Sequence, residues 1–446
     1  MGRVAEELRS YLAVLRESWP LIIAESIGSI AWLVDTFFVS LLGDIAVAGV
    51  GAGGYGSWLL GAFNTPFYVG VMVLASQAIG ARAPDKASRV TGESLAAAVF
   101  LSASAAFVAY FIADEFMLLL TSDPVTASTA SIYLRARVWG LPGLSAFLVL
   151  DAAYRAAKKN RDILYASLIS AVTNAVLDPI LIFYEGMGVR GAGIATATSF
   201  YVGTATLLVY PRRRLGFSPW PRPPRGDAAR SLTLGLPAFA ERLLMNSAHG
   251  FYIGAISRCG SDALAAQTIG VRIESIAFMP GFALNTYASS VVGQLIGAGK
   301  LEEAKEEGWR ITKVAFLMMA LAGGALVAVS PYVPYLFGVS EEVAHLSMVY
   351  LFMAAASEPF LGLVFALTGG IRGAGNTLVP TAVNTAGIYL FRVAPSVAIA
   401  ALHPFSGVAC PIAIWAAMDA DVIARSLILA IVYRRGLERL ARRLVS

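Results

Sequence analysis

The stretch SWPLIIAESIGSIAWLVDTFFVSLL, from Ser18 to Leu42, decides the fold class, because only Glu25 and Asp35 in it are charged. As an α-helix, a run of this length measures about 37 Å, which is enough to cross the ~30 Å hydrocarbon core of a bilayer. Similar runs recur along the chain, and the alternating ten-residue pattern of a membrane barrel is absent. The run therefore predicts a membrane-crossing helix.

The composition extends this prediction to the whole chain. With 57% hydrophobic residues, 14% charged residues and a mean hydropathy of +0.68, the 446 residues are too apolar for a soluble protein of this length. The 42 glycines and 20 prolines fit a transmembrane bundle, where close packing uses glycine. The first residues lack the pattern of a cleaved signal peptide. We expect an all-α polytopic membrane protein.

Twelve apolar segments are long enough to cross the membrane. The predicted spans are 18–42, 46–80, 88–112, 125–150, 162–184, 190–210, 231–258, 262–297, 308–332, 341–369, 378–401 and 406–433. Basic residues gather between alternate spans and in the C-terminal tail, whereas the opposite loops are mostly acidic. The positive-inside rule therefore places both termini in the cytoplasm, in a cell-membrane protein, with Arg190 and Arg258 as the main exceptions on the outer side.

The chain repeats itself at an offset of 217 residues. The offset aligns Pro20 with Pro237, Gln77 with Gln294, Tyr133 with Tyr350, Pro142 with Pro359 and Arg155 with Arg372. Since each half holds six spans, the halves insert in the same orientation, as two six-helix bundles related by a pseudo-twofold axis along the membrane normal. A cavity between such bundles suits alternating access by rocking.

The predicted domains are an N-terminal bundle of residues 1–210, a cytoplasmic linker of residues 211–230 and a C-terminal bundle of residues 231–446. The linker contains PRRRLGFSPWPRPPRG, from Pro211 to Gly226, which has no apolar helical face. We interpret it as a topogenic linker, with binding to anionic lipid as the alternative.

Two intramembrane acids break the repeat. Asp35 aligns with Tyr252, and Asp178 aligns with Pro395. A carboxylate inside the membrane is costly unless it is paired, hydrated or protonated, and is therefore a candidate functional residue. The acidic chemistry thus points to the N-terminal half.

Counting helical residues from the predicted outer ends places Tyr133, Asn174 and Thr196 at a similar depth to the two acids. Together these oxygen-bearing groups could ligate Na⁺ or share a proton, and the sequence does not choose between the two ions. A structural polar cluster that joins the helices is the alternative.

Further acids lie in predicted spans, and their roles stay open. Glu241, Glu274 and Glu358 lie near mid-membrane in the C-terminal half and could meet a cationic substrate, although Arg242 and Arg272 could pair with them instead. Asp151 lies near the inner end of its span, where a gate and a loop cap fit equally well.

Several function classes lack their motifs. His249, His345 and His403 have no metal-ligand spacing, and no phosphate-binding glycine loop or nucleophile–base pair is present. Cys259 and Cys410 are expected to be small apolar packing residues. We therefore expect no enzyme, no cofactor beyond a coupling ion, and no nucleic-acid partner.

The chain resembles the multidrug and toxic compound extrusion (MATE) family over nearly its whole length. The matching stretches are WLVDTFFVSLLGD around Asp35, ASQAIGAR from Ala75, VTNAVLDPILIF around Asp178, GAGIATATS around Thr196, FMPGFALNTYASSVVGQLIGAGK ending at Lys300 and GGIRGAGNT from Gly369. The resemblance implies two bundles arranged as a V, and an exporter driven by inward Na⁺ or H⁺ flow.

The resemblance also implies roles for single residues. Asp35, Asn174, Asp178 and Thr196, with Tyr133 beside them, look like the cation site of prokaryotic members. Tyr133, Asp151 and Asp178 fall where archaeal-type members line a drug cavity, and Glu241 resembles an acid that other branches use for ion or drug. Those branches have a second acid near Leu361, whereas here Glu358 stands about a turn earlier.

The expected function is export of amphipathic, often cationic, organic compounds by a monomer in the lipid bilayer, coupled at Asp35, Asn174, Asp178, Thr196 and Tyr133. The expected substrate contacts are Tyr133, Asp151, Asp178, Glu241 and Glu274. One alternative is a flippase for lipids or lipid-linked sugars, which would need a basic cavity built from residues such as Arg242, Arg272 and Arg392. A passive channel is another.

Overall fold

The computed structural model describes residues 2–209, 215–332, 335, 337–402, 405 and 407–445, and these residues form helices and no β-strand. The arginines of the linker at 212–214 and His403 lie outside the described residues. The predicted all-α class is confirmed.

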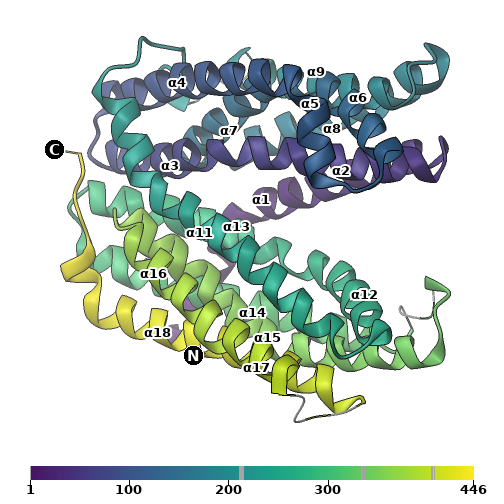
Figure 1. Ribbon diagram of the computed structural model, residues 1–446. Helices are drawn as coiled ribbons and strands as arrows, with labels where there is room; N and C mark the ends of the chain where they lie inside the picture. Colours follow the sequence, from purple (N-terminus) through teal and green to yellow (C-terminus); the bar gives the residue numbers. More distant parts are fainter. Residues whose placement is uncertain are drawn as a thin grey trace. The chain divides into compact units, whose positions relative to one another are not determined.

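The helices alternate with short connections along both halves (Figure 1). The N-terminal half contains α1 (Gly2–Ser40), α2 (Asp44–Gly61), α3 (Thr65–Gly80), α4 (Pro84–Phe111), α5 (Ala113–Leu120), α6 (Pro124–Val138), α7 (Leu141–Ala156), α8 (Asn160–Pro179) and α9 (Val189–Val209). The C-terminal half contains α11 (Gly226–Ser257), α12 (Ser261–Ala277), α13 (Met279–Gly297), α14 (Leu301–Val329), α15 (Glu341–Gly373), α16 (Leu378–Gly387), α17 (Ala394–Leu402) and α18 (Ala409–Leu440).

Grouped by the predicted spans, these helices form twelve crossing segments, six in each half. Four segments consist of two helices in series, namely α2 with α3, α6 with α7, α12 with α13, and α16 with α17. Among the described residues, eight helical stretches are long and apolar enough to cross a membrane on those two measures alone. Charged residues are concentrated in some of the other segments, such as Arg135, Arg137 and Asp151 in α6 and α7.

The chain forms two compact units. The first, called here the N-terminal unit, is Trp19–Phe239 with Val445–Ser446, and the C-terminal unit is Met1–Ser18 with Ala240–Leu444. The predicted bundles of residues 1–210 and 231–446 follow the boundaries of the sequence repeat. The two units instead group residues that pack together in space. The first turns of α11 thus belong to the N-terminal unit.

A buried carboxylate holds the start of α11 within the N-terminal unit. Glu93 on α4 is 3% exposed, and its Oε2 accepts hydrogen bonds from the backbone N–H groups of Arg225 (2.8 Å), Asp227 (2.9 Å) and Ala228 (3.3 Å). The first N–H groups of a helix have no partner within it, so an acid from a neighbouring helix satisfies them and complements the helix dipole. Lys86 adds an ion pair to Asp227.

Each unit contains a buried tyrosine that packs against a glycine, and the two pairs are related by the repeat. A Cβ atom on Gly53 of α2 would lie 2.8 Å from Cδ1 of Tyr133, and one on Gly270 of α12 would lie 2.1 Å from Cδ1 of Tyr350. Such distances are shorter than real Cβ contacts, so only glycine lets these helices approach. The repeat therefore preserves a packing contact as well as residue types.

The interpretation of the cysteines as packing residues was wrong. Cys259, just after α11, and Cys410, in the first turn of α18, form a disulfide whose Cα atoms are 5.7 Å apart. Two cysteines are too few for a disulfide framework, but they suffice for one cross-link when distant helix ends meet. The two cysteines are 151 residues apart, so the sequence does not show that they are close in space.

Two adjacent glycines of α2 test the packing of Tyr133. We expect Gly53→Ala to lower the free energy of unfolding by roughly 1–3 kcal/mol, because its methyl group would also meet the Ala130 carbonyl oxygen at 2.8 Å. Gly54→Ala is the matched control, since no atom lies within 4 Å of the added methyl group. Thermal unfolding in detergent measures both variants, and equal melting temperatures would contradict the close packing.

Candidate functional site

The N-terminal unit encloses a cavity of about 320 Å³ between α1, α6, α7, α8 and α9. Asp35, Asn174 and Thr196 line it, as do Asp151 and Arg137. Three of the five predicted coupling residues thus face one cavity, and Asp178 and Tyr133 are buried in the same unit.

Asp35 on α1 and Asp178 on α8 are the central pair. They are 6% and 0% exposed, and they lie close enough to interact electrostatically. Asn174, one helical turn before Asp178, donates from Nδ2 to Oδ1 of Asp178 at 3.3 Å. Oδ1 of Asp35 and Oδ2 of Asp178 are buried without any hydrogen-bond partner among the described residues. Because buried polar atoms are normally paired, these oxygens fit a bound cation or a proton.

Tyr133 and Thr196 complete the predicted set. Tyr133 on α6 is 1% exposed and interacts electrostatically with Asp35. The hydroxyl of Thr196 donates to the carbonyl oxygen of Ala192 in its own helix, at 3.0 Å. A π-helical turn, Ile180–Tyr184, follows Asp178 and Pro179. Proline removes a backbone donor, and π turns of this kind are frequent at functional sites.

Arg137 was not among the residues predicted from the sequence. This arginine on α6 donates from Nη1 to the hydroxyl oxygen of Tyr133 (2.6 Å) and from Nε to Oγ of Ser57 (3.0 Å), and it interacts electrostatically with Asp35. A signal was available, since an arginine inside a predicted span and four residues after Tyr133 shares a helix face with that tyrosine. The cavity therefore contains a fixed cation beside its acids.

Asp151 is part of an ion-paired group. Its Oδ2 accepts a hydrogen bond from Nε of Arg155 at 2.7 Å, one helical turn away on α7. Arg155 also donates to Oε1 of Glu25 on α1, at 2.9 Å. Asp151 lines the cavity with its Oδ2 paired to Arg155, and its Oδ1 has no hydrogen-bond partner among the described residues.

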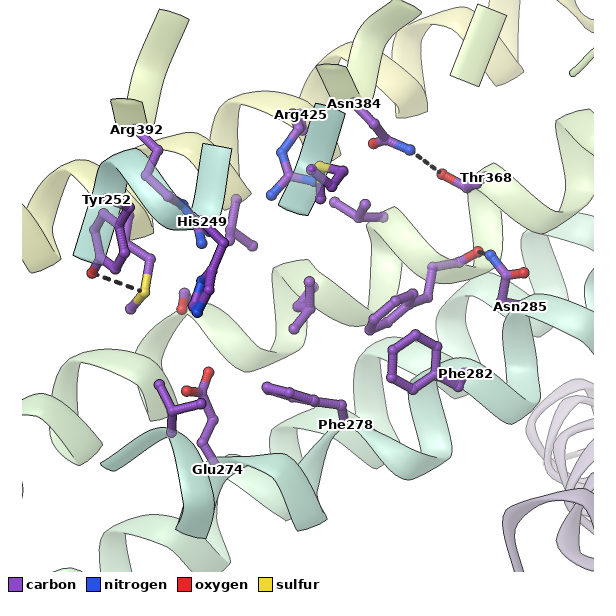
Figure 2. A pocket seen from close by; sticks show the side chains of 18 of the residues that line it. His249, Tyr252, Glu274, Phe278, Phe282, Asn285, Thr368, Asn384, Arg392 and Arg425 are labelled. Atoms are coloured by element: carbon purple, nitrogen blue, oxygen red, sulfur yellow. Dashed lines mark hydrogen bonds between the residues drawn. The ribbon is translucent and has the colours of Figure 1, made fainter. Parts of the chain in front are cut away.

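The C-terminal unit encloses a separate cavity of about 460 Å³. In Figure 2, Glu274 and His249 face each other across it, and the rings of Phe278 and Phe282 lie along one side. Glu274 accepts a hydrogen bond from the hydroxyl of Tyr350, the repeat counterpart of Tyr133. An aromatic cavity with a few polar groups is typical of small-molecule binding.

Glu241 lines the same cavity, but its carboxylate is fully engaged. Oε2 accepts from Nη2 of Arg372 (2.7 Å) and from Oγ1 of Thr381 (2.8 Å), and Oε1 accepts from Nδ2 of Asn384 (2.9 Å). Arg372 is the repeat counterpart of Arg155, so each half pairs this arginine with an acid of its first helix. Both carboxyl oxygens of Glu241 therefore already have partners within the protein.

Other buried charges of the C-terminal unit lie on α15, α18 and the π-helical turn Ile388–Val393. Asp421 is 0% exposed and pairs with both Arg392 (2.9 Å) and Arg425 (2.6 Å). Glu358 is 1% exposed, and neither of its carboxyl oxygens has a hydrogen-bond partner in the described part of the chain. Glu358 therefore resembles Asp35, because both are buried acids with a carboxyl oxygen that has no hydrogen-bond partner among the described residues.

These geometries fit a monovalent cation or a proton better than a transition metal. No group of three or more His, Cys, Asp or Glu side chains within the described ranges could hold a metal ion. Carboxylate, amide and hydroxyl oxygens are the donors that the N-terminal cavity offers, and such groups suit hard ions.

Two known proteins are similar to this chain over most of their length. The chain is 24% identical to the probable multidrug resistance protein NorM of Thermotoga maritima over 416 residues, which cover 91% of this chain and 88% of that protein. It is 25% identical to the chloroplastic protein DETOXIFICATION 44 of Arabidopsis thaliana over 382 residues, 83% of this chain and 72% of that protein.

Solved structures share the fold. The crystal structure of the Vibrio cholerae MATE transporter VcmN in the bent form matches with a TM-score of 0.89 at 18% identity, over 98% of this chain and 99% of that chain. A transporter of the MOP superfamily from Pyrococcus furiosus, described as having reverse polarity of its binding pocket, matches with a TM-score of 0.87 at 21% identity, over 97% of each chain.

The MatE family model matches twice, at residues 20–180 and 237–397, and the two matches are offset by the 217 residues of the internal repeat. The matched residues make up more than half of the chain. This chain belongs to the MatE family, a family of multi-pass membrane transporters, not of enzymes.

Proposed function

We propose that this chain is a secondary active multidrug exporter that releases amphipathic, often cationic, organic compounds in exchange for Na⁺ or H⁺. The names of its relatives, which are multidrug resistance and DETOXIFICATION proteins, support the export of many compounds. Coupling is assigned to the cluster of Asp35, Asn174, Asp178, Thr196 and Tyr133. The observation that supports this assignment most is the pair of buried, unpartnered oxygens on Asp35 and Asp178.

The mechanism follows from the cost of an unpaired carboxylate in the membrane. A Na⁺ ion that enters the cavity would stabilise the ionised carboxylates of Asp35 and Asp178. A proton would instead neutralise one of these carboxylates. A state of the transporter that binds the ion more tightly is then favoured, so the ion gradient drives the conformational cycle.

The proposed orientation has both termini in the cytoplasm, which would put the Cys259–Cys410 disulfide on the outer side, where disulfides persist.

The proposed substrate contacts differ from the predicted set at two residues, Asp151 and Glu241. Tyr133, Asp151, Asp178, Glu241 and Glu274 were the predicted set, and the ion pairs of Asp151 and Glu241 make those two acids positioning residues instead. Glu274, beside the rings of Phe278 and Phe282, keeps its proposed contact with substrate.

The flippase alternative is less favoured. It needs a basic cavity for a phosphate headgroup, but Arg242 and Arg272 are exposed residues that are not among those lining the C-terminal cavity. Arg372, Arg392 and Arg425 line it, but each of them is paired with Glu241 or Asp421.

The test uses protein reconstituted in liposomes, with ethidium efflux driven by a pure Na⁺ gradient or a pure H⁺ gradient. We expect Asp35→Asn and Asp178→Asn to reduce efflux to the level of protein-free liposomes under the gradient that drives the wild type. Glu358→Gln is the matched control, since it removes a buried acid of the C-terminal unit whose two oxygens have no hydrogen-bond partner among the described residues. Loss of efflux in Glu358→Gln with undiminished efflux in Asp35→Asn would move coupling to the C-terminal unit.

Arg137 gives a second prediction. Its positive charge competes with an ion at Asp35, so Arg137→Gln should lower the ion concentration needed for half-maximal efflux several-fold. Arg258→Gln, which changes an exposed arginine of a connecting loop, controls for the loss of charge in general. An unchanged or increased ion requirement in Arg137→Gln would contradict a role of Arg137 at the coupling cluster.

The pairing of Glu241 gives a third prediction. Glu241→Gln and Arg372→Gln should each lower the free energy of unfolding by ~3 kcal/mol, because each leaves the other charge buried without its partner. The double variant should recover most of this loss. Melting temperatures in detergent measure the series, and additive losses would show that the two charges are independent.

A further inference from the structure

The N-terminal unit has a second hollow, which the proposed transport function does not use. It has a volume of about 520 Å³ and lies between α6, with Ile132, Arg135 and the C-cap residue Trp139, and one face of α9, with Arg190, Ile194 and Tyr201. We call it the α6–α9 groove. Ile132, Trp139 and Tyr201 are 44%, 49% and 46% exposed, so the groove opens along the surface of the unit. In a membrane protein, exposed apolar side chains of crossing helices face lipid.

One end of the groove is basic. Arg190 is the second residue of α9 and is exposed, with no hydrogen bond or ion pair to another residue in the part of the chain that the structure describes. Arg135 donates to Oδ2 of Asp114 on α5 (2.6 Å) and to the carbonyl oxygen of Tyr110 (3.2 Å). Hydrogen bonds from Ser131 and Arg135 lower the pKa of Asp114, so that carboxyl is ionised at neutral pH. Arg135 is thus neutralised by Asp114, and Arg190 leaves one positive charge without a counter-charge among the described residues.

The rest of the groove is aromatic and apolar. Tyr201 donates from its hydroxyl to the carbonyl oxygen of Trp139 at 2.6 Å, which joins α9 to the end of α6. Tyr201 lies eleven residues, or ~16 Å, along α9 from Arg190. That distance is about half of the ~30 Å hydrocarbon thickness, so the groove spans one leaflet.

We propose that the α6–α9 groove binds an anionic phospholipid of the adjacent leaflet, with its phosphate between Arg190 and Arg135 and an acyl chain along Trp139 and Tyr201. The excess positive charge complements the phosphate, and the lateral opening admits a chain that stays in the bilayer. In the predicted orientation this leaflet is the outer one, and the lipid accounts for Arg190, a basic residue that the positive-inside rule leaves unexplained. The proposal is independent of which ion drives transport.

The experiment measures lipid binding by the purified full-length protein. Native mass spectrometry should detect phosphatidylglycerol bound more tightly than phosphatidylcholine. Arg190→Gln should weaken phosphatidylglycerol binding about fivefold, the factor that corresponds to ~1 kcal/mol per basic residue near an anionic surface. Arg258→Gln, the other exposed arginine on the predicted outer side, should leave it unchanged. Equal binding by wild type and Arg190→Gln, or an equal loss in both variants, would overturn the proposal.

A second measurement locates the lipid. Phosphatidylglycerol with a photoactivatable acyl chain should label peptides of α6 and α9, and labelling confined to other helices would overturn the assignment. Glycerol phosphate at millimolar concentration should not displace the lipid, because the acyl chain contributes to binding. Displacement would show a site for the free headgroup instead. Melting temperatures in phosphatidylcholine alone verify that each variant is folded.

Discussion

A charged group inside a membrane bundle must find its counter-charge within that bundle, and much of this structure depends on that constraint. Arg155 pairs with Glu25 and Asp151, Arg372 pairs with Glu241, and Asp421 pairs with two arginines. The pairs Arg155–Glu25, Arg372–Glu241 and Arg392–Asp421 connect different helical segments, so they help to fix how these segments pack. Asp35, Asp178 and Glu358 differ, because each has a buried oxygen without a hydrogen-bond partner and none has an ion pair in the described part of the chain, and such costly groups persist where they serve a function.

Duplication preserved the framework and changed the chemistry inside it. The glycine contacts of Tyr133 and Tyr350 and the ion pairs of Arg155 and Arg372 follow the repeat. The partners of the two tyrosines differ: in the N-terminal unit Arg137 links Tyr133 to Ser57, whereas in the C-terminal unit Glu274 occupies the position equivalent to Ser57 and binds Tyr350 directly. The buried tyrosine is therefore hydrogen-bonded to an arginine in the N-terminal unit and to a glutamate in the C-terminal unit.

The sequence predicted what depends on local spacing and on the repeat. Apolar run length predicted the helices, the offset of 217 residues predicted the duplication, and helical spacing placed Asn174 beside Asp178. It could not predict contacts between distant helices, because these depend on packing. Glu241 and Arg372 are 131 residues apart, so the neutralisation of this acid was not visible, and the same holds for the disulfide. Arg137 differs, because its place inside a predicted span and four residues after Tyr133 can be read from the sequence.

Arg137 also limits how many ions the proposed coupling cluster can hold. Asp35 and Asp178 contribute two negative charges when both are ionised, and Arg137 interacts with Asp35 as one fixed positive charge. One Na⁺ or one proton then brings the cluster to neutrality, whereas a second would add a net charge to a buried site and incur a desolvation cost of several kcal/mol. A cluster of two acids without the arginine would accept two ions at the same cost. The fixed cation therefore favours the movement of a single charge in each cycle.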